Sequence, residues 1–182
     1  MKYINSKWFT LIELLISITI FLILTMMTYV NYATYQNIAK VKLSLKEVSQ
    51  SINEARNMAI NGYDKNKVNQ SIWVFFDVND KNIVKYYGYN FNSWITLSQA
   101  NIIKEKKLQD WVEIDKISGH NKIMIHFSSI YGIPTIYYFD ESGEKQDYSW
   151  DILDFPLSYK WIQNFPFKRN LQYFKNTNVV DY

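Results

Sequence analysis

The feature that most constrains this chain is an uninterrupted apolar segment near its beginning. Residues 9–30, FTLIELLISITIFLILTMMTYV, carry a single charge, Glu13. As an α-helix they would be about 33 Å long, enough to cross the roughly 30 Å apolar core of a bilayer. The segment is longer than the apolar region of an ordinary secretory signal peptide, and no small-residue cleavage site follows it. The sequence therefore predicts one membrane-spanning helix.

Lysines on either side of this segment predict its orientation. Lys2 and Lys7 precede it, which favours a cytoplasmic N-terminus with the rest of the chain outside. Lys40, Lys42 and Lys46 follow it and weakly oppose that orientation. We therefore expect a single-pass cell membrane protein whose later residues are periplasmic or extracellular.

Glu13 is unusual because a carboxylate within the apolar layer costs about 2.5–3.5 kcal/mol at its centre and less near an end. It either reaches the headgroups or needs a positive partner. Its surroundings favour the second explanation, since KWFTLIELL, residues 7–15, resembles the class III signal of type IV pilins and type II secretion pseudopilins. In that family a short basic leader ends in a small residue, a phenylalanine follows, and an apolar helix begins with T-L-I-E-L.

The resemblance implies a processing site and an assembly residue. A membrane peptidase would cut between Trp8 and Phe9 and methylate the new amine of Phe9. Glu13, the fifth residue of the processed chain, would then pair with the N-terminal ammonium of a neighbouring subunit, so that both charges are desolvated together. The chain departs from the family at Trp8, where the family has glycine or, less often, alanine or serine. A chain left uncut would lack a free amine at Phe9.

The resemblance also implies the partners of this chain. These are other pilin subunits bundled through their helices, the prepilin peptidase, the inner-membrane assembly platform, and membrane lipid before assembly. No cofactor is implied, since the work of assembly would come from a separate cytoplasmic ATPase.

A helical pattern continues beyond the apolar segment. Apolar residues recur every three or four positions up to Gly62, a helix stop signal, so residues 9–60 are expected to form one helix of 52 residues, about 78 Å long. The stripe could pair with a coiled-coil partner or pack on the protein's own sheet, and the small Ala55 and Ala59 favour the sheet. The stripe is Ile38, Val41, Leu45, Val48, Ile52, Ala55 and Ala59, and the face expected to be solvated is Lys40, Lys42, Lys46, Glu47, Gln50, Glu54 and Arg56.

The later part of this helix resembles one branch of the same superfamily. Residues 43–61, LSLKEVSQSINEARNMAIN, are similar to the end of the helix in GspH/FimT-type pseudopilins, which reads approximately L-x-x-A-R-x-x-A-I. Together with the leader signal, the resemblance covers the first third of the chain. It implies that the second half of the helix lies against a β-domain.

From about residue 70 the period changes to that of β-strands. Residues 71–78 and 82–91 are rich in β-formers and flank Asn79-Asp80, which predicts a hairpin. Further strands are expected at residues 94–98, 134–140, 146–150, 157–162 and 170–174.

Residues 111–117 and 122–128 are predicted to form a second pair around a turn at residues 118–121. Alternation in the first of these would place Val112, Ile114 and Lys116 on one face, with Trp111, Glu113, Asp115 and Ile117 on the other.

These patterns predict an α+β fold, in which a long N-terminal helix packs on a C-terminal antiparallel β-sheet or β-sandwich. The expected organisation is a leader at residues 1–8, a transmembrane half-helix at 9–30, an amphipathic half-helix at 31–62 and a β-rich globular domain at 63–182.

The residue inventory argues against catalysis. The absence of cysteine excludes a disulfide scaffold, a zinc ribbon, an iron–sulfur site and a thiol enzyme. His120 and His126 fall in a predicted turn and a predicted strand, with no carboxylate at ligand spacing, so no metal site is expected. Residues 77–81, DVNDK, begin like a calcium loop, but Lys81 stands where a ligand is needed and a turn is the better interpretation. Nucleotide-binding and hydrolase motifs are missing. We expect no enzyme.

Basic and aromatic residues alternate near the end of the chain. Such a surface can stack bases and hold phosphates, and some FimT-type minor pilins bind DNA through basic residues toward their C-terminus. The alternative is that the aromatic residues pack in the sheet core and the cations merely flank them. The candidate nucleic-acid-binding residues are Lys160, Lys168, Arg169 and Lys175.

The sequence therefore predicts a structural protein, a minor pilin or pseudopilin of GspH/FimT type. Three alternatives remain open at this stage. They are a DNA-binding minor pilin that acts in DNA uptake, the major pilin itself, and an unprocessed single-span envelope protein.

Overall fold

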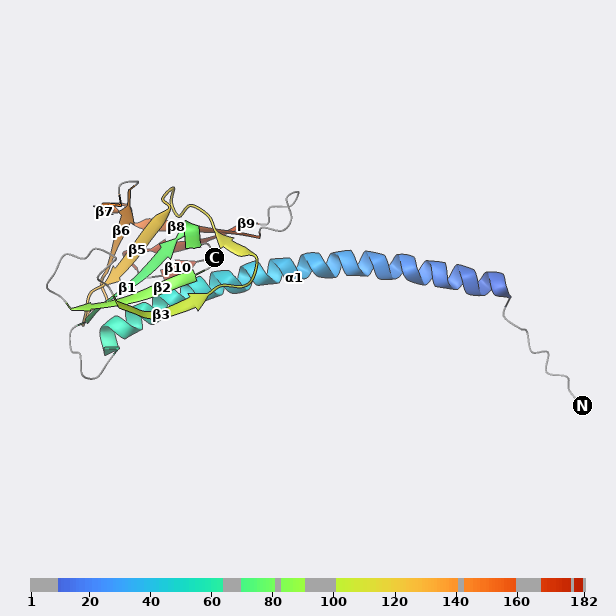
Figure 1. Ribbon diagram of the computed structural model, residues 1–182, viewed down its shortest axis with the longest axis horizontal. Helices are drawn as coiled ribbons and strands as arrows, with labels where there is room; N and C mark the ends of the chain where they lie inside the picture. Colours follow the sequence, from blue (N-terminus) through green and yellow to red (C-terminus); the bar gives the residue numbers. More distant parts are fainter. Residues whose placement is uncertain are drawn as a thin grey trace, which may run out of the picture. The chain divides into compact units, whose positions relative to one another are not determined.

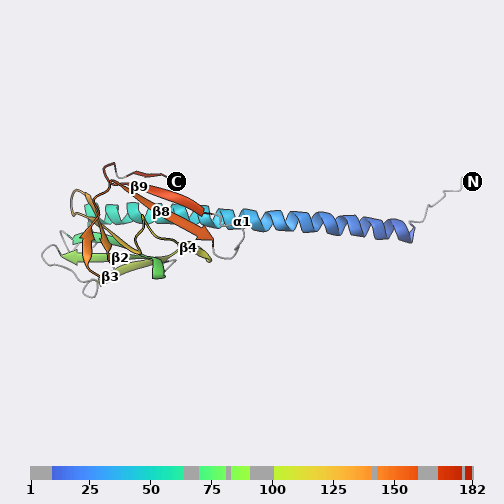
Figure 2. The ribbon, with the colours of Figure 1, turned by 90° about the horizontal axis from the view of Figure 1, so that it is seen from above.

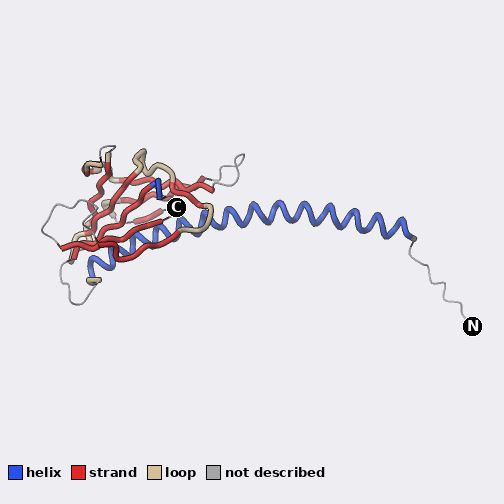
Figure 3. Tube along the Cα trace, in the orientation of Figure 1, coloured by secondary structure: helices blue, strands red, loops and turns tan. Residues whose placement is uncertain are grey.

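The computed structural model describes residues 10–63, 70–80, 83–90, 101–140, 143–159, 168–177 and 179–181. One long helix, α1 (Leu11–Asn61), is followed by antiparallel strands (Figures 1 and 3), so the expected α+β class is confirmed. The helix has 51 residues, against 52 expected, and Phe9 lies outside the described residues. Gly62 follows its end at φ 77°, a left-handed conformation that glycine adopts at little cost.

The strands form two sheets. A six-stranded sheet has the order β3-β2-β1-β5-β6-β7, and a four-stranded sheet has the order β10-β9-β8-β4. All strand pairs are antiparallel. The elements among the described residues are β1 (Gln70–Asp77), the 3₁₀ turn η1 (Val78–Asp80), β2 (Ile83–Asn90), β3 (Asn101–Lys107), β4 (Val112–Ile114), β5 (Lys122–Phe127), β6 (Pro134–Phe139), β7 (Lys145–Asp147), β8 (Ile152–Tyr159), β9 (Lys168–Phe174) and β10 (Val179–Asp181).

The chain divides into two compact units, Met1–Ile38 and Ala39–Tyr182. In the second unit a single hydrophobic cluster contains residues of α1 and of both sheets. Figures 1 and 2 agree that the last turns of α1 lie beside the strands. Six of the seven predicted stripe residues are 0–3% exposed, and only Ile38 is half-buried. Phe76 of β1 meets Phe155 of β8 edge-to-face at 4.8 Å, so the two sheets share this core.

Most predicted strands are confirmed. The hairpin expected at residues 71–78 and 82–91 is β1 paired with β2, and residues 122–128, 134–140 and 170–174 correspond to β5, β6 and β9. Residues 146–150 overlap the shorter β7, and 157–162 overlap the end of β8, which begins at Ile152. Strands β3 and β10 were not predicted, and residues 94–98 lie outside the described residues.

The predicted pairing of residues 111–117 with 122–128 is wrong. β4 pairs with β8 in the four-stranded sheet, whereas β5 pairs with β1 and β6 in the other sheet. The isolated bridge between Ile117 and His120 closes the turn before β5 and does not pair the two segments.

The predicted alternation also ends at Ile114. Ile117 is fully buried and Lys116 is exposed, because the chain leaves β4 and turns at Ser118 (φ 46°) and Gly119 (φ 88°). Ser118 is tied to β8 by its amide, which donates to the Asp154 carbonyl at 3.0 Å.

Candidate functional site

Thr10 and Glu13 close the first turn of α1. Oε2 of Glu13 accepts hydrogen bonds from the Thr10 amide at 2.9 Å and from the Thr10 hydroxyl at 2.8 Å. In return, Thr10 Oγ1 accepts a bond from the Glu13 amide at 3.3 Å. This is a capping box, which satisfies amides that the start of a helix otherwise leaves unpaired. The T-x-x-E spacing signals it in the sequence, but the sequence analysis did not consider it.

From Leu11 to Tyr29 the first unit exposes large apolar side chains. Between Thr10 and Ile38, Glu13 is the single charged residue. The large apolar side chains from Leu11 to Tyr29 are 51–82% exposed. Among the described residues, α1 is the helix that is long and apolar enough to cross a membrane. No residue of its most apolar stretch is buried in the protein.

Hydroxyl groups along this apolar segment are satisfied within the helix. Ser17, Thr19, Thr25 and Thr28 each donate to the carbonyl four residues earlier, at 2.7–2.9 Å. A hydroxyl that is already bonded to its own helix costs less to place in hydrocarbon than an unpaired one. Of the polar side chains in residues 11–28, the Glu13 carboxylate therefore remains as the costly one.

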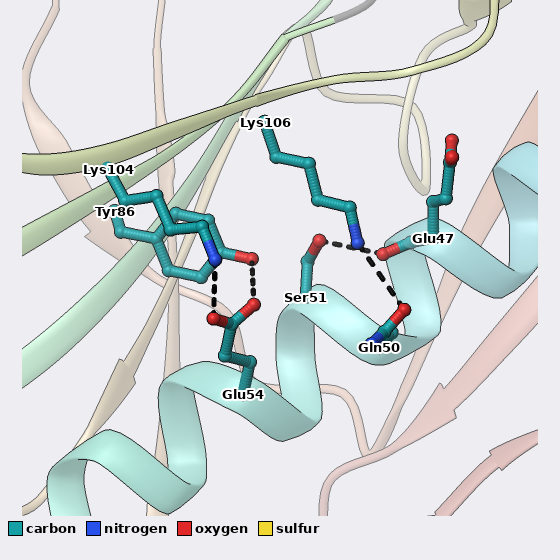
Figure 4. Close-up of polar contacts among 7 residues, drawn as sticks. All are labelled: Glu47, Gln50, Ser51, Glu54, Tyr86, Lys104 and Lys106. Atoms are coloured by element: carbon teal, nitrogen blue, oxygen red, sulfur yellow. Dashed lines mark hydrogen bonds and ion pairs between the residues drawn. The ribbon is translucent and has the colours of Figure 1, made fainter.

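A group of polar side chains lies between the second half of α1 and strands β2 and β3, and we call it the polar seam (Figure 4). It consists of Glu47, Gln50, Ser51 and Glu54 of α1, Tyr86 of β2, and Lys104 and Lys106 of β3. Glu54 is its centre. Its Oε1 lies 2.5 Å from Lys104 Nζ, and its Oε2 accepts a bond from the Tyr86 hydroxyl at 3.3 Å. Lys106 Nζ reaches Gln50 Oε1 at 3.5 Å.

The predicted solvated face is confirmed at Lys42, Lys46 and Gln50, which are exposed, but the prediction is wrong for Glu47 and Glu54. Glu47 and Glu54 are half-buried, and Gln109 donates to Glu47 Oε1 at 2.9 Å. The reason is that β3, which the sequence analysis did not predict, contributes the lysines that face this side of the helix. Burial raises the pKa of Tyr86 above its ordinary value, and the Glu54 carboxylate adds to this effect while a hydrogen bond with Ser51 opposes it. Tyr86 therefore acts as a neutral donor.

The three candidate nucleic-acid-binding residues that the structure describes, Lys168, Arg169 and Lys175, are not gathered on one surface. Lys168 Nζ lies 3.4 Å from Asp115 Oδ2. Arg169 has the strand parity of the buried Leu171 and Tyr173, so it and Lys168 project from opposite faces of the sheet. Lys175 follows the other end of β9, about 20 Å along the strand direction. Lys160 lies outside the described residues.

The two histidines lie apart, in different surroundings. His126 of β5 rests against Trp73 at 4.6 Å between ring centroids, and burial together with the Lys145 ammonium lowers the pKa of His126 to about 4. The ring of His120 stacks on Tyr138 at 4.0 Å. Among the residues described, no three His, Cys, Asp or Glu side chains form a group that could hold a metal ion.

Trp8 and Phe9, the predicted processing site, lie outside the described residues. Comparison with protein-family models, with curated proteins and with solved structures found no match to this chain.

Proposed function

We propose that this chain is a structural subunit, a minor pilin or pseudopilin, of a type IV pilus or a type II secretion-like filament. The observation that carries the proposal is the first unit of the chain. The large apolar side chains from Leu11 to Tyr29 are 51–82% exposed, and Glu13 is the single charged residue between Thr10 and Ile38. Such a surface is stable in lipid or against other apolar helices, and a filament subunit needs it in both settings, first as an anchor and then in the filament core.

Glu13 has the geometry for an intermolecular ion pair. Thr10 bonds to Oε2 only, so among the described residues Oε1 has no hydrogen-bond partner. In the proposed filament this oxygen receives the N-terminal ammonium of the neighbouring subunit, which processing between Trp8 and Phe9 would create. An ammonium and a carboxylate that meet in an apolar layer offset much of each other's desolvation cost.

The second unit supports a structural rather than a catalytic role. The hydrophobic cluster joins the helix stripe to both sheets, and the polar seam adds directional contacts along it. In the proposal the second half of α1 packs on a β-sandwich. The N-terminal residues lie in the cytoplasm, and the β-rich residues lie on the other side of the membrane. Neither a cofactor nor a catalytic residue takes part.

Three substitutions separate the charge of Glu13 from its role in the capping box. Glu13→Gln keeps a capping-box side chain but removes the charge. Glu13→Ala removes both, and Thr10→Ala removes the cap but keeps the charge. We expect Glu13→Gln and Glu13→Ala to lower incorporation into sheared filaments about tenfold or more, because each leaves the neighbouring ammonium buried without a partner. Thr10→Ala should stay within about threefold of the parent protein, since a lost cap costs about 1 kcal/mol.

The measurement is the amount of each variant in sheared filaments relative to the amount in the membrane fraction. Normal incorporation of Glu13→Gln, with equal defects in Glu13→Ala and Thr10→Ala, would show that Glu13 serves only the helix start. Abundance in the same filaments distinguishes a minor from a major subunit. Mass spectrometry of the N-terminal peptide tests processing, since an N-methylated Phe9 is expected and a chain that begins at Met1 would favour an unprocessed envelope protein.

A further inference from the structure

A polar cleft of about 490 Å³ opens in the second unit, where three segments of the β-region meet. Its walls come from η1, from the turn between β4 and β5, and from the end of β6. Its volume falls within the roughly 300–1,000 Å³ typical of small-molecule sites. The cleft is far in sequence from the start of α1, so a ligand could bind there whether or not the chain forms a filament.

Hydrogen bonds hold these walls in place. Asp154 donates from its amide to Ser118 Oγ at 2.9 Å, and the Val78 amide donates to the Asn121 carbonyl at 2.9 Å. Ser118 holds a positive φ of 46°, an unfavourable conformation for serine that persists because β8 anchors it. The cleft is therefore preorganised, which reduces the entropy that a ligand must lose on binding.

The stacked aromatic rings of His120 and Tyr138 line the cleft and form one of its walls. His120 lies against Tyr138 with their planes 28° apart, and it meets the edge of Tyr148 at 5.9 Å between centroids. Tyr138 is half-buried and packs against the main hydrophobic cluster, so the wall is continuous with the core. An aromatic wall of this kind suits the apolar face of a sugar ring.

Hydrogen-bonding and charged groups surround this wall. The carboxamides of Asn79 and Asn121 line the cleft, and each offers both donors and an acceptor. Lys116 and Lys122 also line it. Lys116 is exposed, whereas Lys122 Nζ lies 3.7 Å from Asp77. Asp140 supplies one carboxylate, whose Oδ1 accepts the Glu144 amide at 2.9 Å.

We propose that this cleft binds an acidic saccharide, a sugar ring that carries a carboxylate. The carboxamides suit hydroxyl groups, which both donate and accept, while Lys116 suits the carboxylate. A bare inorganic anion fits less well, because it would leave most of the cleft to water. Lys116 reaches the cleft only because the chain turns after β4 instead of continuing as a strand.

Binding to the intact chain tests the proposal, in a detergent without a sugar headgroup. The probes are methyl glucuronide, methyl glucoside as its neutral match, and inorganic phosphate, each titrated by isothermal calorimetry. We expect saturable binding of methyl glucuronide, weaker binding of methyl glucoside, and no displacement of the glucuronide by equimolar phosphate. Lys116→Gln should weaken glucuronide binding about tenfold, the size of one charge-assisted hydrogen bond, and leave glucoside binding unchanged.

Two further variants complete the test. Asn121→Ala removes a carboxamide from the cleft and should weaken both sugars. Lys46→Gln removes an exposed lysine of α1 outside the cleft and should change neither. The proposal is overturned if methyl glucuronide does not bind, if methyl glucoside binds equally well, if phosphate displaces the glucuronide, or if Lys46→Gln acts like Lys116→Gln. Unchanged thermal unfolding of the variants shows that any loss of binding is local.

Discussion

The two halves of α1 bury their apolar residues to opposite extremes. Large apolar side chains from Leu11 to Tyr29 are 51–82% exposed, whereas the stripe from Val41 to Ala59 is 0–3% exposed. The first half exposes its large apolar side chains. The second half gathers its buried apolar residues in one stripe, beside which Glu54 bonds to Tyr86 of β2 and Lys104 of β3.

This difference shows that one helix is built for two environments. The stripe of the second half meets its apolar partner within the chain, so folding of the β-region alone removes it from water. The first half has no such partner among the described residues and can lose its exposed surface only to lipid or to other apolar helices. Stability of the β-region and assembly should therefore respond to substitutions in different halves.

The largest expected effect comes from a matched pair of truncations. Ile52 is 1% exposed and Ile23 is 55% exposed. Ile52→Ala should lower the free energy of unfolding of the β-region by about 2–4 kcal/mol, because it leaves a cavity in the shared core. Ile23→Ala should change it by less than about 0.5 kcal/mol. Denaturant titration of the intact chain in detergent, followed by tryptophan fluorescence, measures both values. Equal effects would show that the two halves share one core.

Acid should weaken the β-region by a smaller amount. The pKa of His126 is about 4 in the folded protein and about 6.5 when unfolded, so the unfolded chain binds the proton first as pH falls. Neutral His126 therefore contributes to the free energy of unfolding above about pH 6.5, and this contribution is lost as pH falls from 6.5 to 4. The expected loss is about 2 kcal/mol, after allowance for partial solvent screening.

A difference measurement isolates this titration from that of the carboxylates. Unfolding free energies of the parent chain and of His126→Gln are compared from pH 7 to pH 4, and their difference should change across this range. Lys145→Met should reduce the change, because the Lys145 ammonium contributes to the lowered pKa of His126. A constant difference between the parent chain and His126→Gln would contradict the prediction.

The smallest expected effect concerns single hydroxyl groups. Tyr86→Phe removes a buried donor to Glu54 and should lower the free energy of unfolding by about 1 kcal/mol. Thr25→Val removes a hydroxyl that bonds only to its own helix and should change it by less than about 0.5 kcal/mol. The same denaturant titrations measure both. If Tyr86→Phe has no effect, the polar seam orients the helix without adding net stability.

Much of the fold could be predicted because its signals are local. The 3.6-residue period identified the buried stripe of α1, and Gly62 marked the end of the helix. Alternating β-formers identified the hairpin of β1 and β2. Strand β3, with the sequence NIIKEKK, was missed because four of its seven residues are charged. It lies at a sheet edge, where lysines discourage pairing with other chains.

Of the two candidate sites, the one at Glu13 could be predicted from the sequence and the cleft could not. The resemblance around Glu13 selected that residue, and the capping box could have been read from its T-x-x-E spacing. The cleft could not have been predicted, because Asn79, Lys116 and Asp140 belong to three segments that only folding brings together.

The sequence by itself determined where the chain is helical, which face of the later helix is apolar, and that the first half is long and apolar enough to cross a membrane. These properties depend on the order of neighbouring residues, and local periodicity expresses them directly. Only the tertiary structure decided that β4 joins β8, that β3 covers one side of α1 with lysines, and that Lys116 faces a cleft. The alternating pattern of one strand is compatible with many partner strands. Which partner it pairs with depends on packing between residues far apart in the chain.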